Sequence, residues 1–433
     1  MNAGFCSVKI TPEIGTPIAG NYRADNLTHG VFHDIFSRSV CLRDGDSLCS
    51  LTSVDLCAIA AWQVDAIRER VVRATPLAKE NVTVAAIHNH SGPTTGVLTP
   101  GGERQDVIDR LIEQIADSII GAYEDLQPVS LRLGRAEEAE LPNNRRVWCQ
   151  DGKIHMNWEK HDTSFWIQEA GPIDPELLTL SFHDPHGSVR GIIVNYTLHP
   201  AVLAGDNNLT SADYVGFMVR ALSSELPGSP EVLFFNGAEG NVNHINPWDP
   251  DQIRGFKEAE RIGRRVAMQA ATAYASAEPM ESPELVSIQK IIPVPRRKVS
   301  EEKIAWAQGV LAKWDGKPIT LVDGCPDEVY AQAALKLASL QHEMVEAEVQ
   351  IHQIGDLRIV TLPGEFFVEY GLRIKQVAGQ GRTMVIGLAN GVIGYLPTPK
   401  AFEEGGYEIT LGHQSYLDET AGEIVLAAIE RML

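Results

Sequence analysis

Histidines follow two of the strands that the sequence predicts to be buried. His88 and His90 come directly after the apolar run NVTVAAI (81–87), and residues two apart in an extended segment share a face. His199 follows GIIVNYTL (191–198), and the proline after it favours an extended backbone. Open α/β sheets gather their ligands beyond the carboxyl ends of the strands. We therefore expect these imidazoles to address one point in space.

A carboxylate and a phenol occupy the same kind of position later in the chain. Glu365 follows LRIVTLP (357–363), and Tyr395 follows TMVIGLAN (383–390) and a glycine. Two imidazoles and a carboxylate are a common ligand set for catalytic zinc, which keeps one position open for water. Zinc bound in this way lowers the pKa of that water and polarises a carbonyl oxygen, which predicts a hydrolase of amide or ester bonds. The predicted zinc ligands are His88, His199, Glu365 and Tyr395.

Each of these residues, taken alone, also fits an ordinary structural role. Loop and core histidines are often simply hydrogen-bonded. Glu365 could complement a helix dipole, and Tyr395 could be a packing residue with one satisfied hydroxyl. Their shared position after buried strands favours the metal interpretation. A purely structural metal remains an alternative, although such sites are usually rich in cysteine and none of the six cysteines is near these motifs.

Composition narrows the class of protein and its partners. The chain has 433 residues, 44% of them hydrophobic, and 37 Lys and Arg against 57 Asp and Glu, a formal net charge of −20. Such a charge repels phosphate backbones and anionic lipids, so we expect a small-molecule substrate and no nucleic acid. No signal peptide or apolar run of membrane-spanning length is found, which predicts a cytoplasmic protein without membrane insertion. A signal peptide removed beforehand would give the same sequence, and a homo-oligomer is compatible with it.

Short apolar runs alternate with amphipathic stretches, which is typical of an α/β protein. We expect a large mixed sheet flanked by helices on both faces, within a single catalytic domain over residues 1–433. Residues from about 280 to 350 are charged and weakly apolar, which predicts a peripheral helical insertion. No repeat of fixed period is found. The remaining predicted strands are 37–43, 47–56, 177–183 and 232–236, and the predicted helices are 61–74, 107–126, 214–226, 258–277, 368–378 and 421–433.

Several segments along nearly the whole chain resemble the catalytic domain of the neutral/alkaline non-lysosomal ceramidase family. In that family the first histidine of HxHSGP, the histidine before proline, the glutamate of PGEF and a later tyrosine bind zinc. The resemblance therefore implies the same four ligands as the strand-end argument. The segments that carry it are GVFHDIFSRSVCLRDG (30–45), SVDL (53–56), IHNHSGP (87–93), NNRR (143–146), IDPEL (173–177), YTLHP (196–200), SADYVGF (211–217), NGAEGNVN (236–243), LPGEF (362–366) and GYLPTPKAFEEGGYE (394–408).

The resemblance also implies roles for residues around the metal. His90 is expected beside the zinc-bound water, where it would manage a proton. Arg145 is expected to contact the substrate, and Tyr407 to help hold the developing oxyanion. Each of the last two has a plain alternative, since Arg145 could pair with a surface carboxylate and Tyr407 could only pack.

The chain departs from the family pattern at one functional position. Where ceramidases carry a serine needed for activity, this sequence has Asn243, followed by His244, and we expect both to face the substrate without supplying a nucleophile. We also expect no C-terminal β-sandwich domain. Both departures favour a small polar acyl compound over ceramide. Ceramide hydrolysis and an inactive, metal-retaining binding protein remain the alternatives.

Overall fold

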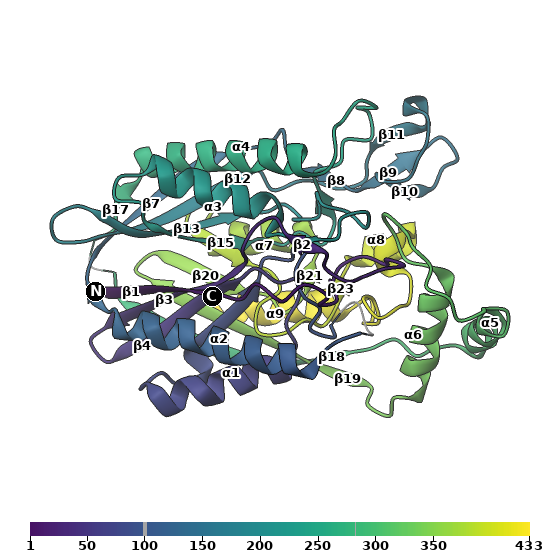
Figure 1. The fold of residues 1–433 in the computed structure, drawn as a ribbon, viewed down its shortest axis with the longest axis horizontal. Helices are drawn as coiled ribbons and strands as arrows, with labels where there is room; N and C mark the ends of the chain where they lie inside the picture. Colours follow the sequence, from purple (N-terminus) through teal and green to yellow (C-terminus); the bar gives the residue numbers. More distant parts are fainter. Residues whose placement is uncertain (98–101, 282) are drawn as a thin grey trace.

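Mixed β-sheets with helices packed around them form the centre of the molecule (Figure 1). This computed structural model describes residues 1–97, 102–281 and 283–433. Within those ranges there are three sheets of four or five strands, each mixing antiparallel and parallel pairs. The predicted α/β class is confirmed, but the expected single large sheet is divided into three.

The same order of elements occurs three times in the described chain. Each unit contains a first strand, a second strand, a third strand in a hairpin with it, a helix, a fourth strand parallel to the third, and a second helix. The first unit consists of β1 (Asn2–Lys9), β3 (Phe36–Asp44), β4 (Ser47–Val54), α1 (Ala61–Ala74), β5 (Val82–Ala86) and α2 (Gln105–Glu124). The second consists of β7 (Ser130–Glu137), β12 (Glu176–His183), β13 (Val189–Tyr196), α3 (Asp213–Glu225), β15 (Glu231–Asn236) and α4 (Phe256–Ala275). The third consists of β18 (Leu285–Pro295), β19 (Met344–Ile354), β20 (Leu357–Thr361), α7 (Val368–Ala378), β22 (Thr383–Ile386) and α9 (Ala421–Met432).

Strand pairing is the same in all three units. The first strand pairs antiparallel with the second, the second antiparallel with the third, and the third parallel with the fourth. The parallel pairs are β4 with β5, β13 with β15 and β20 with β22, each joined by a crossover helix as parallel strands require. Two strands in each sheet therefore end at the same edge.

Long excursions separate the first and second strands of the units, at residues 10–35, 138–175 and 296–343. The shorter elements lie in these excursions, in the loops beyond the strand ends, and, for η1, β6 and β17, directly after a helix. These are β2 (Gly30–Val31), η1 (Lys79–Asn81), β6 (Gln127–Pro128), β8 (Asn143–Asn144), β9 (Arg146–Cys149), β10 (Ile154–Met156), η2 (Thr163–Phe165), β11 (Trp166–Glu169), β14 (Leu209–Thr210), β16 (Val242–Asn243), β17 (Glu278–Pro279), α5 (Glu301–Leu311), α6 (Asp327–Ser339), β21 (Glu365–Phe366), β23 (Tyr395–Leu396), α8 (Pro399–Glu404) and η3 (Tyr407–Ile409).

The predicted helical insertion over about 280–350 is only partly present. Helices α5 and α6 lie inside it, but its ends are the strands β18 and β19, which pair with each other over eleven residues each. In β19 the charged side chains alternate with buried ones, the two-residue period of a strand with one polar face. The sequence interpretation gave weight to charge and missed this alternation.

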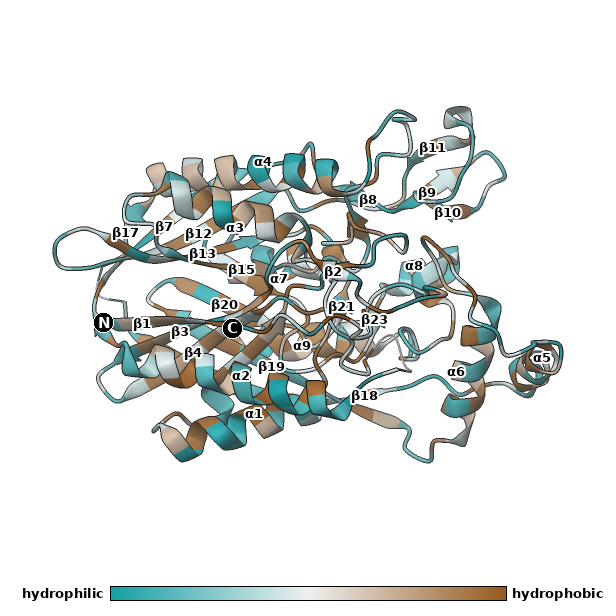
Figure 2. Cartoon of the chain, viewed as in Figure 1, coloured by the Kyte–Doolittle hydropathy of each residue, from teal (hydrophilic) through white to brown (hydrophobic). Residues whose placement is uncertain are grey.

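Helices cover the outer faces of the sheets, and the inner faces pack against one another. Strands from all three sheets contribute to one buried cluster that includes Phe5, Phe182, Phe235 and Ile359. In a second cluster the helices α1, α2, α3 and α4 pack against the first two sheets. In a third cluster α7 and α9 pack against the third sheet. In Figure 2, α1, α2 and α4 carry hydrophobic and hydrophilic residues side by side, as helices with one packed face do. Helices therefore flank the sheet layers on the outside.

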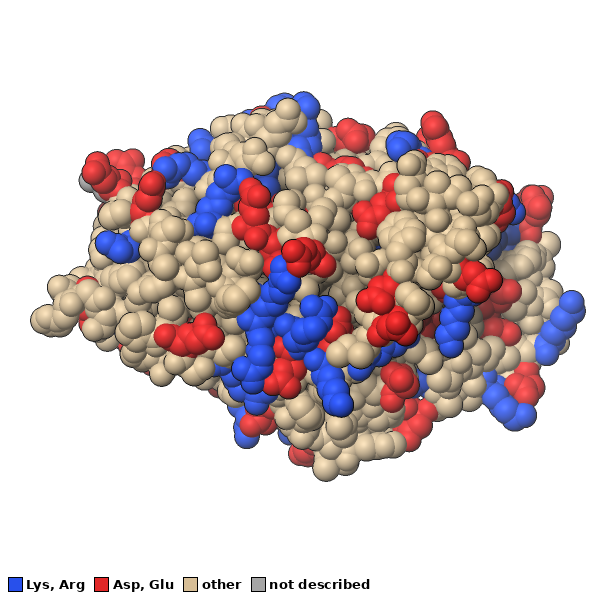
Figure 3. All heavy atoms as spheres, turned by 90° about the horizontal axis from the view of Figure 1, so that it is seen from above, with Lys and Arg blue, Asp and Glu red and all other residues tan. Residues whose placement is uncertain are grey.

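Charged side chains of both signs lie on one face of the molecule. Figure 3, seen from above relative to Figure 1, shows acidic and basic side chains interspersed on that face. Of the helices in the described chain, none is both long and apolar enough to cross a membrane.

The centre of the inter-sheet core gives a stability prediction. Phe182 is fully buried, and its ring meets that of Phe5 edge-on, with centroids 5.3 Å apart. Phe182→Ala removes that contact and leaves a cavity, so we expect the free energy of unfolding to fall by about 3–5 kcal/mol. Urea or guanidinium denaturation measures it, with the exposed Ile14→Ala as control. An equal loss in the two variants would contradict this account of the core.

Candidate metal centre

The predicted ligands converge where the strand ends of the three units meet. His88 follows β5, His199 follows β13 and Glu365 follows β20, so each unit contributes one side chain. All three are buried, and their candidate ligand atoms lie within 4.8 Å of one another. The geometric expectation from the sequence is met for this trio.

Hydrogen bonds between the sheets fix this convergence. Ser53 Oγ of β4 donates to the carbonyl of Phe234 at 2.6 Å, which joins the first sheet to the second. The Asn195 side chain of β13 donates to the carbonyl of Val385 at 2.8 Å, which joins the second to the third. The backbone N–H of residue 86 donates to the carbonyl of residue 388 at 3.1 Å and closes the ring.

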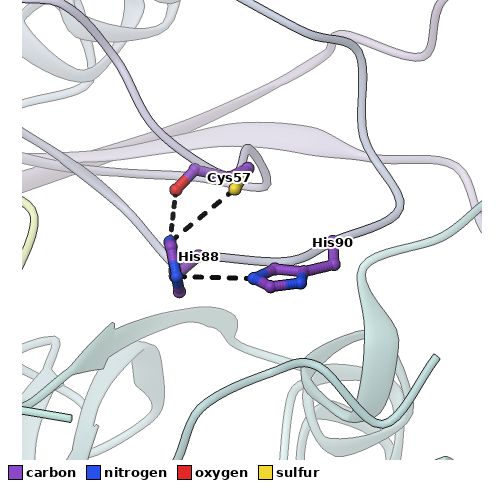
Figure 4. Close-up of side chains that lie close together, drawn as sticks. All are labelled: Cys57, His88 and His90. Atoms are coloured by element: carbon purple, nitrogen blue, oxygen red, sulfur yellow. Dashed lines mark hydrogen bonds between the residues drawn. The ribbon is translucent and has the colours of Figure 1, made fainter. Parts of the chain in front are cut away.

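His88 is held in one orientation by its backbone and its outer nitrogen. Its φ of 72° lies in the left-handed region, which is uncommon for a non-glycine residue and clusters at functional sites. Its Nδ1 lies 2.7 Å from the carbonyl oxygen of Cys57, to which it donates (Figure 4). That bond leaves Nε2 as the inward-facing atom, 3.3 Å from Glu365 Oε2. The expectation that no cysteine lies near these motifs is therefore wrong for Cys57, whose Sγ is 3.8 Å from Nδ1.

This arrangement fits a zinc ion. Donors at 2.0–2.2 Å from a tetrahedral ion stand about 3.3 Å apart, the separation found between His88 Nε2 and Glu365 Oε2. A backbone carbonyl on the outer nitrogen of a ligand histidine is the usual way of fixing its tautomer. Two imidazoles and a carboxylate are also a donor set that suits zinc.

The electrostatics of the group show why it needs positive charge. Burial lowers the pKa of His88, but the charge of Glu365 and the contacts with Cys57 together outweigh burial and hold that pKa well above its usual range. Burial, with the charge of His88, holds the pKa of His199 well below its usual range. One positive charge among these groups is therefore favoured, whether a proton on His88 or a metal ion supplies it.

His90 lies beside the ligands. Its Nε2 is 3.4 Å from the Nε2 of His88 and 3.4 Å from that of His199 (Figure 4 shows His88 and His90). Gly20, with φ +93°, lets the first excursion approach this ring, because a Cβ there would fall 2.4 Å from the imidazole. Arg23 donates to the His90 carbonyl at 2.9 Å and to that of Ala19 at 3.1 Å. The loop that carries His90 is therefore held in place, and its imidazole lines the pocket described below.

The predicted fourth ligand, Tyr395, is placed directly beside Glu365. The two residues are register partners in the parallel pair β21 and β23. Tyr395 is buried, and burial raises the pKa of its phenol well above the usual range, although Arg145 opposes that rise. The guanidinium carbon of Arg145 lies 5.2 Å from the centre of the Tyr395 ring.

Arg145 and Tyr407 form one wall of the same pocket. Arg145 Nε donates to Glu408 Oε1 at 2.8 Å, and its guanidinium carbon lies 5.9 Å from the centre of the Tyr407 ring. Trp158 stands edge-on to Tyr407, with centroids 5.4 Å apart. The alternative that Arg145 only pairs with a surface carboxylate is therefore met in part. Arg145 does pair with a carboxylate, but Glu408 is buried, and Arg145 still lines the pocket.

Asn243 and His244, which we expect to face the substrate, both line the pocket, but the amide of Asn243 is largely engaged. Asn243 Oδ1 accepts from Asn157 Nδ2 at 2.7 Å, and Asn243 Nδ2 donates to Asn157 Oδ1 at 2.9 Å. Asn243 therefore positions the loop around Asn157. His244 is buried, and burial lowers its pKa to about 4, so its imidazole is neutral at pH 7.

All three excursions contribute to the pocket wall. The first supplies Gly20 and Asn21, the second Arg145 and Trp158, and the third Asp323 and Gly324, around a space of about 550 Å³. The side chains at the base come from the loops beyond the strand ends. They are His90, His199, Asn243, His244, Tyr395 and Tyr407.

Sequence reasoning missed Glu239, a buried carboxyl close to the ligands. It follows β15, so the strand-end argument that found His199 applied to it as well. Burial raises its pKa to about 8; the charge of His88 opposes that rise and the charge of Glu365 adds to it. Glu239 belongs to none of the His, Cys, Asp and Glu groups of metal-binding spacing among the described residues.

Comparisons with known proteins agree in pointing to one family. The sequence model of the neutral/alkaline non-lysosomal ceramidase N-terminal region matches residues 2–232. A neutral ceramidase of Pseudomonas aeruginosa is 22% identical over 384 residues, which cover 76% of this chain and 56% of that protein. A neutral ceramidase of Mycobacterium tuberculosis is 22% identical over 458 residues, covering 90% of this chain and 70% of the relative. The chain thus spans only about half the length of the Pseudomonas relative.

Solved structures show the same fold. The crystal structure of neutral ceramidase from Pseudomonas aeruginosa superposes with a TM-score of 0.76 at 19% sequence identity, covering 100% of this chain and 73% of that one. A structure described as ceramidase complexed with C2 gives a TM-score of 0.74 at 19% identity, covering 99% and 73%.

The buried carboxyls Glu365 and Glu239 form a matched pair for a metal-binding test. Glu365→Gln removes a charged ligand, so we expect the protein to lose its tightly held ion after dialysis against a weak chelator. Glu239→Gln replaces a carboxyl that is largely protonated at pH 7 by a neutral amide of the same shape, and metal content should stay near one ion per chain. Elemental analysis of dialysed protein measures both. Equal retention in the two variants would remove Glu365 from the ligand set.

Proposed function

Because the chain belongs to the neutral/alkaline non-lysosomal ceramidase family, we propose that it is a zinc-dependent hydrolase of an amide or ester bond. The observation that carries this proposal is the meeting of His88, His199 and Glu365 beside a pocket open to solvent, which His199 itself lines. Structural zinc sites are usually rich in cysteine and closed to solvent. Cys57 lies behind His88, where its carbonyl oxygen accepts from Nδ1 and its Sγ stands 3.8 Å from the same nitrogen.

The surrounding residues suit hydrolysis at a carbonyl group. A bound zinc ion supplies Lewis acidity and an activated water. His90, with Nε2 facing the ligand nitrogens, is placed to take a proton from water and deliver it to the leaving nitrogen or oxygen. Arg145 and Tyr407 are placed to stabilise negative charge on the carbonyl oxygen as the C–N or C–O bond breaks.

We propose a small polar acyl compound as the substrate. The pocket wall is rich in groups that form hydrogen bonds, including Asn21, Arg145, His244 and Asp323. Asn243 offers no hydroxyl, and most of its amide is bonded to Asn157. The acidic balance of the chain also argues against nucleic acid as a partner.

Ceramide is a second candidate, and one feature of the structure favours it. An adjoining pocket of about 760 Å³ shares Asn21 with the metal pocket. Its lining includes Ile18, Trp314, Ile319 and Val329, which suit an acyl or alkyl chain. The relatives from Pseudomonas aeruginosa and Mycobacterium tuberculosis are neutral ceramidases, which points the same way.

A substrate panel with metal control tests the proposal. N-acyl amino acids, N-acyl sugars, lactones, aryl esters and N-acylsphingosines of short and long chain are incubated with the protein, and product release is measured. We expect turnover of a polar member that stops with a chelator and returns with added zinc. His88→Ala should lower kcat/KM by more than about 100-fold, which exceeds the usual loss when only a residue behind a metal ligand is changed. The exposed His29→Ala is the control and should match the unaltered protein.

The other outcomes separate the alternatives. Preferential turnover of N-acylsphingosines would establish the second candidate. Metal retention without turnover of any compound would support a binding protein that has lost catalysis, and turnover that ignores the chelator would overturn the zinc mechanism.

Tyr407 gives a test of charge stabilisation on whichever compound turns over. Tyr407→Phe removes one hydroxyl from the pocket wall, and we expect kcat to fall by about 10²–10³ with metal content unchanged. Tyr416→Phe serves as the matched control, because Tyr416 does not line the pocket. An unchanged kcat in Tyr407→Phe would leave Tyr407 a packing residue only.

A further inference from the structure

A second group of metal-binding side chains lies on the outer side of the pocket wall. His155 is in β10, and Glu159 and His161 are in the loop that follows; candidate ligand atoms of all three lie within 4.8 Å of one another. Glu159 Oε2 is 2.7 Å from His155 Nδ1 and 3.4 Å from His161 Nε2. Between 23% and 39% of each of these side chains is exposed, so an ion can reach them from solvent.

The partners of His155 prepare it for a cation. Its Nε2 contacts Asp151 Oδ2 at 2.9 Å, while Nδ1 faces Glu159. A neutral imidazole carries only one N–H, so it can donate to only one of the two carboxylates. Contact with the other carboxylate requires either a second proton on the ring or a metal ion bound at the other nitrogen. A carboxylate on the outer nitrogen is the common support of a metal-bound histidine, and here Asp151 would fill that place.

The spacing needs only a small adjustment to fit an ion. Tetrahedral ligands of zinc stand about 3.3 Å apart. Glu159 Oε2 and His161 Nε2 already have that separation, and the pair formed with His155 must open by about half an ångström. Two imidazoles with one carboxylate favour zinc, cobalt, nickel or copper over calcium and magnesium, which prefer oxygen ligands throughout.

The inner side of this loop belongs to the catalytic pocket. Glu159 Oε1 accepts from the backbone N–H of Met156 at 3.0 Å, which closes a tight turn around Asn157 and Trp158. Asn157 carries the reciprocal amide pair with Asn243 described above. Trp158 stands against Tyr407 and lies 5.4 Å from the guanidinium carbon of Arg145.

We propose that His155, Glu159 and His161 bind a second divalent transition-metal ion, supported by Asp151, and that this ion fixes the turn carrying Asn157 and Trp158. The site is separate from the buried centre in its residues and in its access to solvent. Binding at this outer site does not depend on the proposed hydrolase function.

The test uses the full chain with Zn²⁺ as the probe. Protein already holding its buried ion is dialysed against increasing Zn²⁺, and bound metal is counted. We expect a second ion in the unaltered protein and its loss in a variant combining His155→Ala and His161→Ala. Asp151→Asn should weaken this second binding by about 10- to 100-fold. His29→Ala, which removes another exposed histidine paired with a carboxylate, should keep both ions.

Two further measurements make the outcome decisive. His88→Ala should lose the buried ion and keep the outer one, so failure at one centre is distinguished from failure at the other. Hydrogen exchange of the backbone over residues 154–161 should slow on zinc addition in the unaltered protein only. Equal zinc binding in the unaltered protein and the double variant would overturn the proposal and leave the cluster as a protonated ion-pair brace. A second ion without slower exchange would overturn its effect on the turn.

Discussion

The structure depends on placing positive charge among groups that have been removed from water. Two imidazoles and a carboxylate are buried together at the meeting point of three sheets, and such burial costs free energy unless a cation balances it. The inter-sheet hydrogen bonds, the left-handed backbone at His88 and the carbonyl of Cys57 all serve to hold these donors at one centre. The surrounding pocket is positioned by the same strand ends.

Three units with the same strand order explain how distant parts of the chain reach that centre. In each unit the third and fourth strands are parallel and end at the same edge, so the loops after them face inward together. His88 follows a fourth strand, whereas His199 and Glu365 follow third strands. The equivalent loop after β15 supplies Glu239. The candidate ligands therefore come from one topology that occurs three times in the described chain, with different side chains after the strands of each unit.

The sequence could predict what depends on local pattern. Buried strands such as β5 and β13 are continuous apolar runs, so both they and the histidines after them were found. The strand β19 was missed because charged residues alternate with its buried ones, and β18 because several of its apolar residues are exposed and it borders a charged segment. The three units were invisible because they share topology without a sequence period. Pairings such as Asn157 with Asn243 depend on long-range contacts that neither segment reveals alone.

The candidate metal centre and much of the pocket wall belong to different portions of the chain. The donors lie in short loops anchored on the packed strands, whereas much of the outer wall belongs to the excursions, which leave and re-enter each sheet between its first two strands. Such a division allows an excursion to change in length and composition during evolution while the reaction centre is inherited intact. The 296–343 segment, whose Trp314, Ile319 and Val329 shape the neighbouring cavity, is the portion through which related proteins could diverge toward different substrates.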